Sequence, residues 1–210
     1  MRRIPALRRI GLDLDNTIVD YAALIREEVV ALGVLDVIPA GDKRAVRDAL
    51  RVVPEGESHW TRLQARIYGE RMDAAVPFPG AIAFIERARS NGIEVVIVSH
   101  KSEVAATEVQ GPNLREAARR WLASQGIVGP LGISPESVYF EATRAAKTAR
   151  IATLGLDVFV DDLVEVFVEP GFPVAVQRWL FAPGPLDGDP PVDRHFGSWD
   201  AIERAVFGAD

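Results

Sequence analysis

The sequence contains no cysteine. Disulfide bonds and thiolate metal sites are therefore excluded, and the chain suits a reducing cytoplasm. It also lacks any apolar run near the roughly 18 residues that a membrane span needs. Paired arginines close to the N-terminus precede no apolar stretch of the kind that forms a signal peptide. We therefore expect a cytoplasmic protein without a membrane segment.

Positive charge is scarce as well. The 24 Lys and Arg residues are outnumbered by 30 Asp and Glu residues, which gives a formal net charge of −6. A general nucleic-acid-binding surface is not expected from this balance. The remaining composition, 48% hydrophobic and 26% charged, is that of a globular protein, with enough residues for one core and a smaller appendage.

Two carboxylates interrupt the first apolar run of the chain. Residues 9–21 read RIGLDLDNTIVDY, with Asp13 and Asp15 two positions apart. If this run is a strand, alternation places both side chains on one side as the chain leaves the sheet. Carboxylates forced together repel each other unless a cation lies between them. We expect the chemistry of the protein here.

Apolar strands alternate with helices over most of the chain. Strands are predicted around residues 10–14 and at 93–98, 137–140, 157–160 and 173–181, and helices at 79–90, after Asn113, at 144–154 and at 200–207. Strands that are apolar on both faces, separated by helices, predict an α/β fold with a doubly wound, Rossmann-like parallel sheet. Asn113 is the expected N-cap of its helix.

A block without expected strands separates the first strand from the others. Helical spacing predicts three helices in it, at residues 21–33, 42–53 and 58–72. We therefore predict a discontinuous core of residues 1–20 and 79–210, with a helical insertion at 21–78. In doubly wound sheets, ligands bind beyond the carboxyl ends of the strands, where the strand order reverses. Polar side chains follow three of the predicted strands: Asp13 and Asp15 follow the first, Ser99 the second, and Asp161 and Asp162 the fourth.

This pattern resembles the haloacid dehalogenase-like (HAD) superfamily of phosphohydrolases. The matching residues, in chain order, are Asp13-Leu14-Asp15-Asn16-Thr17 (the DxDxT motif), Ser99, Lys147 and Asp161-Asp162. The resemblance covers residues 8–20 and 79–181, and it implies that the helical insertion is a C1-type cap. A lid of this kind excludes water and adds contacts to the substrate.

The two acids of the first motif have separate expected roles. Asp13 is placed to act as a nucleophile on phosphorus, which gives an aspartyl-phosphate. Asp15 is the expected general acid and base, which protonates the leaving alkoxide and then deprotonates the attacking water. In the superfamily, the second aspartate accompanies phosphatases and phosphomutases and is absent from dehalogenases. The resemblance therefore argues against carbon–halogen cleavage.

Carboxylates in one crevice suit Mg²⁺, which prefers oxygen ligands. We expect Asp13 and Asp162 as direct ligands, with the backbone carbonyl of Asp15. Asp161 would bind the metal either directly or through water. Ser99 is expected to hold phosphate oxygens. Lys147 would balance the charge of the nucleophile, unless it is an ordinary solvated lysine of its helix.

Further substrate contacts are expected from His100 and Lys101, which follow Ser99, although such residues often face solvent. Arg62 and Arg66 give the third helix of the insertion a basic side, which would either meet the substrate or remain solvated. The loop at residues 101–113 is a second candidate for selecting the substrate.

The predicted function is a Mg²⁺-dependent phosphatase that hydrolyses a small phosphate monoester through an aspartyl-phosphate. A phosphomutase would use the same first steps, and a non-catalytic protein of the HAD fold is a further alternative. The expected partner is a small phosphorylated metabolite, not nucleic acid or a membrane. The chain is expected to be a monomer or a homodimer.

Overall fold

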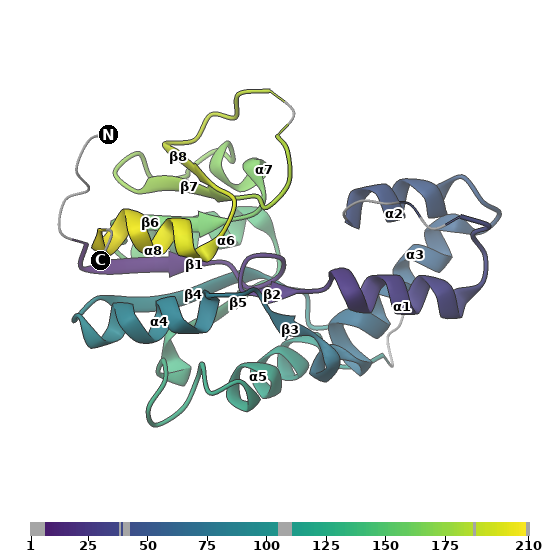
Figure 1. The fold of residues 1–210 in the computed structure, drawn as a ribbon, viewed down its shortest axis with the longest axis horizontal. Coiled ribbons are helices and arrows are strands. Elements are labelled where there is room, and N and C mark those ends of the chain that lie inside the picture. Colours follow the sequence, from purple (N-terminus) through teal and green to yellow (C-terminus); the bar gives the residue numbers. More distant parts are fainter. Residues whose placement is uncertain (1–6, 38, 40–42, 105–110, 187, 209–210) are drawn as a thin grey trace. The chain divides into compact units, whose positions relative to one another are not determined.

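The computed structural model describes residues 7–37, 39, 43–104, 111–186 and 188–208. The chain forms two compact units (Figure 1). One comprises residues 1–19, 77–101 and 126–210, and we call it the core unit. The other comprises residues 20–76 and 102–125, and we call it the helical unit. Among the described helices, none has the length and apolar character needed to cross a membrane.

The core unit contains a six-stranded sheet in which every neighbouring pair of strands is parallel. The strands are β1 (Arg9–Leu12), β4 (Glu94–His100), β5 (Val138–Glu141), β6 (Val158–Asp161), β7 (Gln177–Phe181) and β8 (Arg194–Phe196). The first five confirm the predicted strands. Strand β8 was not predicted, because three residues inside a Pro- and Gly-rich stretch give no periodic signal.

The strand order is β5-β4-β1-β6-β7-β8, so the order reverses beside β1. Strands β4 and β5 extend the sheet in one direction, and β6 to β8 extend it in the other. Leu12 of β1 is in register with Val160 of β6, and the backbone N–H of Asp13 donates to the carbonyl of Val160 at 2.9 Å. The acids that follow β1 are therefore brought beside those at the end of β6, as expected for a switch point.

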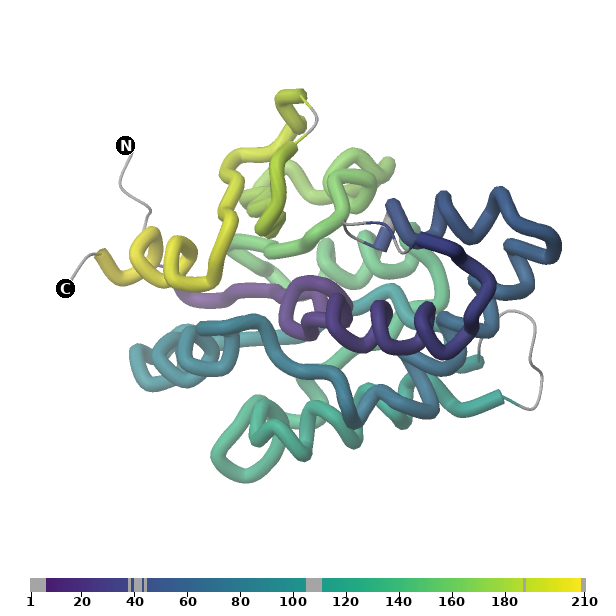
Figure 2. Tube along the Cα trace, turned by 45° about the vertical axis from the view of Figure 1, so that its right-hand side comes forward, coloured from purple at the N-terminus to yellow at the C-terminus, as the bar shows by residue number. Residues whose placement is uncertain are grey.

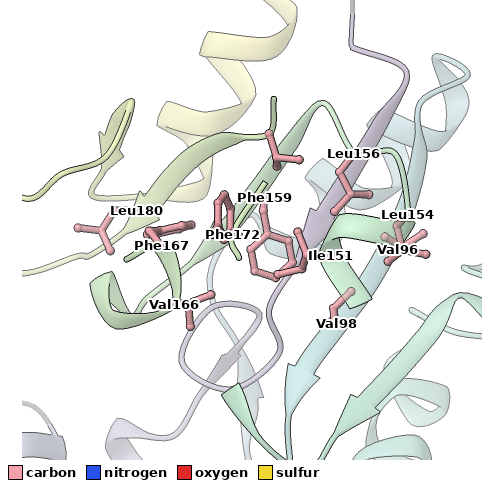
Figure 3. Packing of buried hydrophobic residues seen from close by; sticks show 11 residues of the cluster. Val96, Val98, Ile151, Leu154, Leu156, Phe159, Val166, Phe167, Phe172 and Leu180 are labelled. Carbon is pink, nitrogen blue, oxygen red and sulfur yellow. The ribbon is translucent and has the colours of Figure 1, made fainter. Parts of the chain in front are cut away.

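Helices cover both faces of the sheet (Figure 1). Helices α6 (Arg144–Thr153) and α7 (Val164–Phe167) pack on one face through a buried apolar cluster that includes Ile151, Phe159 and Phe167 (Figure 3). Helices α4 (Ala81–Ser90) and α8 (Trp199–Phe207) lie on the other face, where Trp199 contacts the rings of Phe84 and Phe181. The predicted helices of the core are confirmed.

Gly11 lets the first strand lie close to this apolar cluster. Gly11 is in register with Phe159 on β6. A Cβ atom added at residue 11 would come within 2.5 Å of Leu156 Cδ1 and 2.6 Å of Phe159 Cδ2. Contacts under 3.0 Å cannot be kept, so Leu156 and Phe159 would have to shift if residue 11 carried a side chain, and glycine allows the packing that is seen.

The helical unit contains α1 (Ala22–Leu32), α2 (Lys43–Arg51) and α3 (Gly56–Ala65), as predicted. The third helix does not continue to residue 72 as an α-helix. It passes into a π-helical turn, η1 (Arg66–Glu70), and a 3₁₀ turn, η2 (Met72–Ala74). Two short strands also went unpredicted, β2 (Val19–Asp20) and β3 (Val76–Pro77), which form a two-stranded sheet.

Helix α5 (Leu114–Ser124) belongs to the helical unit although it follows the second strand of the core. The side chain of Asn113 accepts hydrogen bonds from the N–H groups of Arg115 and Glu116, which confirms the predicted N-cap. The indole N–H of Trp121 donates to the carbonyl of Ala75 at 2.8 Å. Residues 102–125 thus belong to the same compact unit as the inserted helices. The division into a core domain and a cap domain, with boundaries at residues 20 and 78, stays a prediction.

Candidate active site

Three acids meet where the strand order reverses. Asp13 directly follows β1, Asp161 is the last residue of β6, and Asp162 comes next. One carboxylate oxygen of each lies within 4.8 Å of the other two. The structure therefore brings together three of the acids that the sequence singled out as metal ligands, from positions far apart in the chain.

Lys147 joins two of these acids. Its helix, α6, is capped by the hydroxyl of Thr143, which accepts from the N–H of Ala146. A side chain in the first turn of a helix leans toward the N-terminus of that helix. The ammonium of Lys147 consequently reaches Asp13 Oδ1 and Asp161 Oδ2, both at 2.6 Å. Lys147 is only 2% exposed, which excludes the alternative of a solvated helix lysine.

Burial and charge shift the acid–base properties of this group. Burial raises the pKa of Asp13 to about 7; Lys147 opposes this rise, and the charges of Asp161 and Asp15 add to it. Burial also acts to lower the pKa of Lys147, but Asp13 and Asp161 outweigh it and hold that pKa above the usual lysine value. One ammonium faces several carboxylates, so the cluster favours a further cation.

The carboxylate oxygens of Asp13 and Asp161 differ in their hydrogen bonds. Asp161 accepts from Lys147 through Oδ2 and from the N–H of Leu163 through Oδ1 at 2.9 Å, and it is fully buried. Asp13 is bound to Lys147 through Oδ1, and no described residue forms a hydrogen bond with its Oδ2. Asp13 therefore has one oxygen held in place and one oxygen available for another contact.

Asp15 owes its position to a turn and not to strand alternation. Strand β1 ends at Leu12, and the chain then closes a tight turn, which Figure 2 shows directly after the strand. The N–H groups of Ile18 and Val19 both donate to the carbonyl of Leu14 at 3.0 Å. Asn16 has a φ of 60°, which lies in the left-handed region. Asparagine tolerates this region better than most residues do.

The C-terminal helix, which is distant in the sequence, also stabilises this turn. Trp199, at the start of α8, donates its indole N–H to the carbonyl of Thr17 at 2.9 Å. Trp199 and Thr17 are both fully buried. Sequence reasoning did not identify Trp199 as a support for the site, because a tryptophan in an amphipathic helix is normally read as part of the core.

Ser99 and His100 lie at the end of β4, which neighbours β1. Ser99 is 1% exposed, and its hydroxyl has no hydrogen-bond partner among the described residues. A buried hydroxyl without a partner is costly, so it suits a ligand that can pair with it. The ring of His100 contacts the carbonyl of Ala142 at 3.1 Å, and burial lowers the pKa of His100.

Lys101 is also buried, at 4% exposed, and its ammonium lies 2.9 Å from Asp15 Oδ2. The sequence predicted that Lys101 contacts the substrate, and it gave no signal of this pairing. The two residues are far apart in the chain, and nothing in a local pattern connects them. The predicted specificity loop that begins at Lys101 falls partly outside the described residues.

Arg66 forms ion pairs within the helical unit. Its guanidinium binds Glu28 of α1, which is 3% exposed, and Glu70 at 3.3 Å. Arg71 also binds Glu28. Nothing in the sequence indicated the ion pairs with Glu28, because a partner on a separate helix cannot be read from helical spacing. Arg62 is exposed. Substrate binding by Arg62 and Arg66 stays a prediction.

Solved structures with similar folds include HAD hydrolases and dehalogenases. A HAD family hydrolase from Deinococcus radiodurans R1, with bound phosphate and sodium, has a TM-score of 0.58 and 17% sequence identity, over 96% of this chain and 95% of that one. YfnB from Bacillus subtilis, described as a HAD-hydrolase and bound to magnesium, has a TM-score of 0.58 and 12% identity, over 96% and 99%. A dehalogenase with an intermediate complex has a TM-score of 0.60 and 12% identity, over 99% and 100%.

No protein-family model and no curated protein sequence matches the chain. At these low identities, the likeness to solved structures concerns the fold. It confirms the predicted α/β class and the resemblance of this chain to HAD proteins.

Proposed function

We propose, from the HAD fold of this chain, that the protein is a Mg²⁺-dependent phosphatase that hydrolyses a small phosphate monoester through an aspartyl-phosphate. The observation that carries the proposal is the convergence of Asp13, Asp162 and Lys147, with one oxygen of Asp13 available. Phosphoryl transfer needs positioning and charge neutralisation more than covalent assistance, and this cluster offers both.

The reaction proceeds in two displacements. In the first, Oδ2 of Asp13 attacks phosphorus, the bond from phosphorus to the ester oxygen breaks, and protonated Asp15 gives its proton to the departing alkoxide. In the second, water attacks the phosphorus of the aspartyl-phosphate and Asp15 takes a proton from it. The bond from Asp13 to phosphorus breaks, and inorganic phosphate leaves.

Lys147 and Ser99 bind and orient groups during both steps. Lys147 fixes the carboxylate of Asp13 through Oδ1, so that Oδ2 is the oxygen that reacts. Its positive charge also offsets charge that collects on the phosphoryl oxygens. The buried hydroxyl of Ser99 donates to one phosphoryl oxygen, which supplies the partner that it lacks among the described residues.

The oxygen donors of this cluster fit Mg²⁺. Asp13 and Asp162 would hold the ion through their side chains, and Asp161, whose two oxygens are engaged, would act through water. When bound, the ion supplies Lewis-acid stabilisation of the phosphoryl group. Magnesium in the Bacillus subtilis structure supports this assignment, and phosphate in the Deinococcus radiodurans structure supports a phosphorylated substrate.

The metal assignment is tested by thermal unfolding. A ligand at 100 times its Kd stabilises a protein by about 2.7 kcal/mol, so millimolar Mg²⁺ should raise the Tm of the wild type. Asp162→Asn should abolish most of this rise, while Glu86→Gln, which changes an exposed acid on α4, should preserve it. An equal rise in the wild type and Asp162→Asn would overturn Asp162 as a ligand.

A haloacid dehalogenase is the main rival, because dehalogenases share the fold. A halide leaves without a proton, whereas an alkoxide requires one, so dehalogenation has no use for the acid at Asp15. We therefore expect Mg²⁺-dependent release of inorganic phosphate from an aryl phosphate and from a panel of small phosphorylated metabolites, with no halide release from 2-haloacids. Halide release without phosphate release would reverse the proposal.

A phosphomutase would return the phosphoryl group to its substrate, so multiple turnovers of inorganic phosphate release separate the two activities. A small soluble phosphorylated metabolite, a cytoplasmic location and a monomeric or homodimeric state complete the proposal. The exposed side chain of Arg62 is the better of the two proposed cap contacts, because Arg66 is engaged by acids. Arg62→Ala is expected to raise KM for the metabolite more than it lowers kcat.

A further inference from the structure

Lysine is rare in this chain and concentrated at the site. Of the 24 cationic residues, only three are lysines: Lys43, Lys101 and Lys147. Lys101 and Lys147 are 4% and 2% exposed. Lysine carries a compact charge with three donors, in contrast to the planar fork of arginine. Two of the three lysines are thus buried point charges beside carboxylates, in a chain whose remaining cations, apart from Lys43, are arginines.

A backbone hydrogen bond fixes the position from which the Lys101 side chain extends. Strand β4 ends at His100, and the N–H of Lys101 donates to the carbonyl of Glu141 on β5 at 2.9 Å. This bond extends the pairing of β4 with β5 by one residue. Because the backbone is tied to the sheet at this point, the lysine side chain has a defined starting position beside the end of β1.

The ammonium of Lys101 engages both oxygens of Asp15. Nζ lies 2.9 Å from Oδ2 and 3.1 Å from Oδ1. The lysine side chain is 3% exposed and the aspartate side chain 19% exposed. A buried ammonium is stable only when it is paired, so this contact satisfies a requirement of the fold. The geometry therefore joins Lys101 to the expected acid–base residue.

Asp15 needs such a constraint. It follows the end of β1 and lies in a turn next to the left-handed Asn16. The terminal torsion of an aspartate is broad, so the backbone alone does not fix the plane of its carboxylate. Proton transfer requires that plane to be directed at the reacting oxygen. An ammonium that contacts both oxygens restrains that plane.

We infer that Lys101 is a positioning residue that fixes the carboxylate of Asp15 for proton transfer, and that it does not bind the substrate phosphate. The inference rests on the proposed phosphatase function. It gives each aspartate of the first motif its own buried lysine: Lys147 holds Asp13, and Lys101 holds Asp15. The predicted substrate contact at Lys101 is the alternative, which a rise in KM alone on substitution would support.

A double-mutant cycle tests whether Lys101 acts through Asp15. Lys101→Met should lower kcat for an alkyl phosphate about 10²-fold, which is the lower range for acid–base assistance, with little change in KM. In the Asp15→Asn background, the same substitution should change kcat by less than about threefold, because the group that it positions is already gone. Loss by the same factor in both backgrounds, or a rise in KM alone, would overturn the inference.

The leaving group provides a readout that a loss of stability would not produce. A 4-nitrophenolate leaves without a proton, so Lys101→Met should form the aspartyl-phosphate rapidly from 4-nitrophenyl phosphate and hydrolyse it slowly. A burst of nitrophenol is the expected sign. Lys101→Arg, which keeps the charge, should recover part of kcat. Arg150→Met removes an exposed ion pair with Glu141 in the same unit and should match the wild type.

Crystal structures separate this inference from the proposed function. In Lys101→Met, the Asp15 carboxylate should rotate away from its wild-type position or become disordered. An unchanged, ordered Asp15 would overturn the inference whatever reaction the protein catalyses. Absence of phosphate release by the wild type would instead overturn the proposed function. Lys101→Met alone could fail to fold because it leaves Asp15 without its counter-charge. In that case, recovery of folding in Lys101→Met/Asp15→Asn supports the Lys101–Asp15 ion pair, and failure to recover counts against it.

Discussion

Asp13 and Lys147 are 134 residues apart in the sequence, and their side chains form an ion pair of 2.6 Å. The sheet explains this contact. Asp13 follows β1, whose neighbour β6 comes directly after α6, the helix that carries Lys147. Because β1 and β6 are parallel, the residue after one strand lies beside the last residue of the other, and the helix N-terminus returns to the same edge.

Lys147→Met should destabilise the protein strongly in the absence of metal. The substitution leaves Asp13 and Asp161 buried without their counter-charge, and breaking a buried pair costs about 3–5 kcal/mol. We expect a fall of this size in the free energy of unfolding, measured in urea by circular dichroism. Mg²⁺ should recover part of the loss, because it brings positive charge to the same acids.

The matched control is Arg150→Met on the same helix. Its ion pair with Glu141 is exposed, and such pairs contribute only about 0–1 kcal/mol. Equal stability of Lys147→Met and the wild type without metal would show that the buried charges are compensated elsewhere.

The positions of three candidate site residues could be predicted, because the acids lie at the ends of strands with a strong apolar signal. Asp13 directly follows β1, Asp161 is the last residue of β6, and Lys147 occupies the first turn of a clear helix. Parallel-sheet topology then brings them together without knowledge of any side-chain contact. The sequence could not predict which side chains on separate helices and strands form ion pairs with each other. The pairing of Lys101 with Asp15 and that of Arg66 with Glu28 depend on how separate elements pack.

Short and irregular elements also escaped prediction. Strand β8 has three residues, and strands β2 and β3 have two each, so none of them shows a period. The π-helical turn after Ala65 follows a sequence that is compatible with an α-helix. The sequence predicted helix α5 and its N-cap, but helical spacing does not say which unit a helix packs against.

Gly11→Ala tests the packing of β1, the strand that precedes the proposed nucleophile Asp13. The added methyl group would collide with Leu156 and Phe159, and overpacking of this kind costs about 1–3 kcal/mol. We expect a lower urea midpoint for Gly11→Ala. Gly184→Ala is the control, since a Cβ there meets nothing within 4 Å, and it should change the free energy of unfolding by less than about 0.5 kcal/mol. Similar midpoints for the two variants would contradict the assigned role of Gly11.

Glu28 should make the stability of the protein depend on acid pH. The hydrogen bond from Arg66 lowers the pKa of Glu28, burial opposes this, and Arg71 lowers the pKa further. Because the folded pKa is below the ordinary value of 4.5, the stabilisation is fully present above pH 4.5 and is lost as the pH falls through the folded pKa.

Glu28→Gln should therefore cost about 1–3 kcal/mol at neutral pH and reduce the loss of stability on acidification. Urea unfolding at neutral pH and below pH 4.5 measures both effects. Glu86→Gln, at an exposed position, should follow the wild type at each pH. A Glu28→Gln protein with the same acid sensitivity as the wild type would show that this network does not contribute to the pH dependence.

The most direct test of the proposed chemistry is to trap the covalent intermediate. The protein is mixed with an aryl phosphate and Mg²⁺, quenched in acid and digested, and the peptide that contains Asp13 is examined by mass spectrometry. We predict a phosphoryl group on Asp13 in the wild type, and neither adduct nor turnover in Asp13→Asn, with its fold retained by circular dichroism. A phosphoryl group on another residue, or wild-type turnover by Asp13→Asn, would contradict the account.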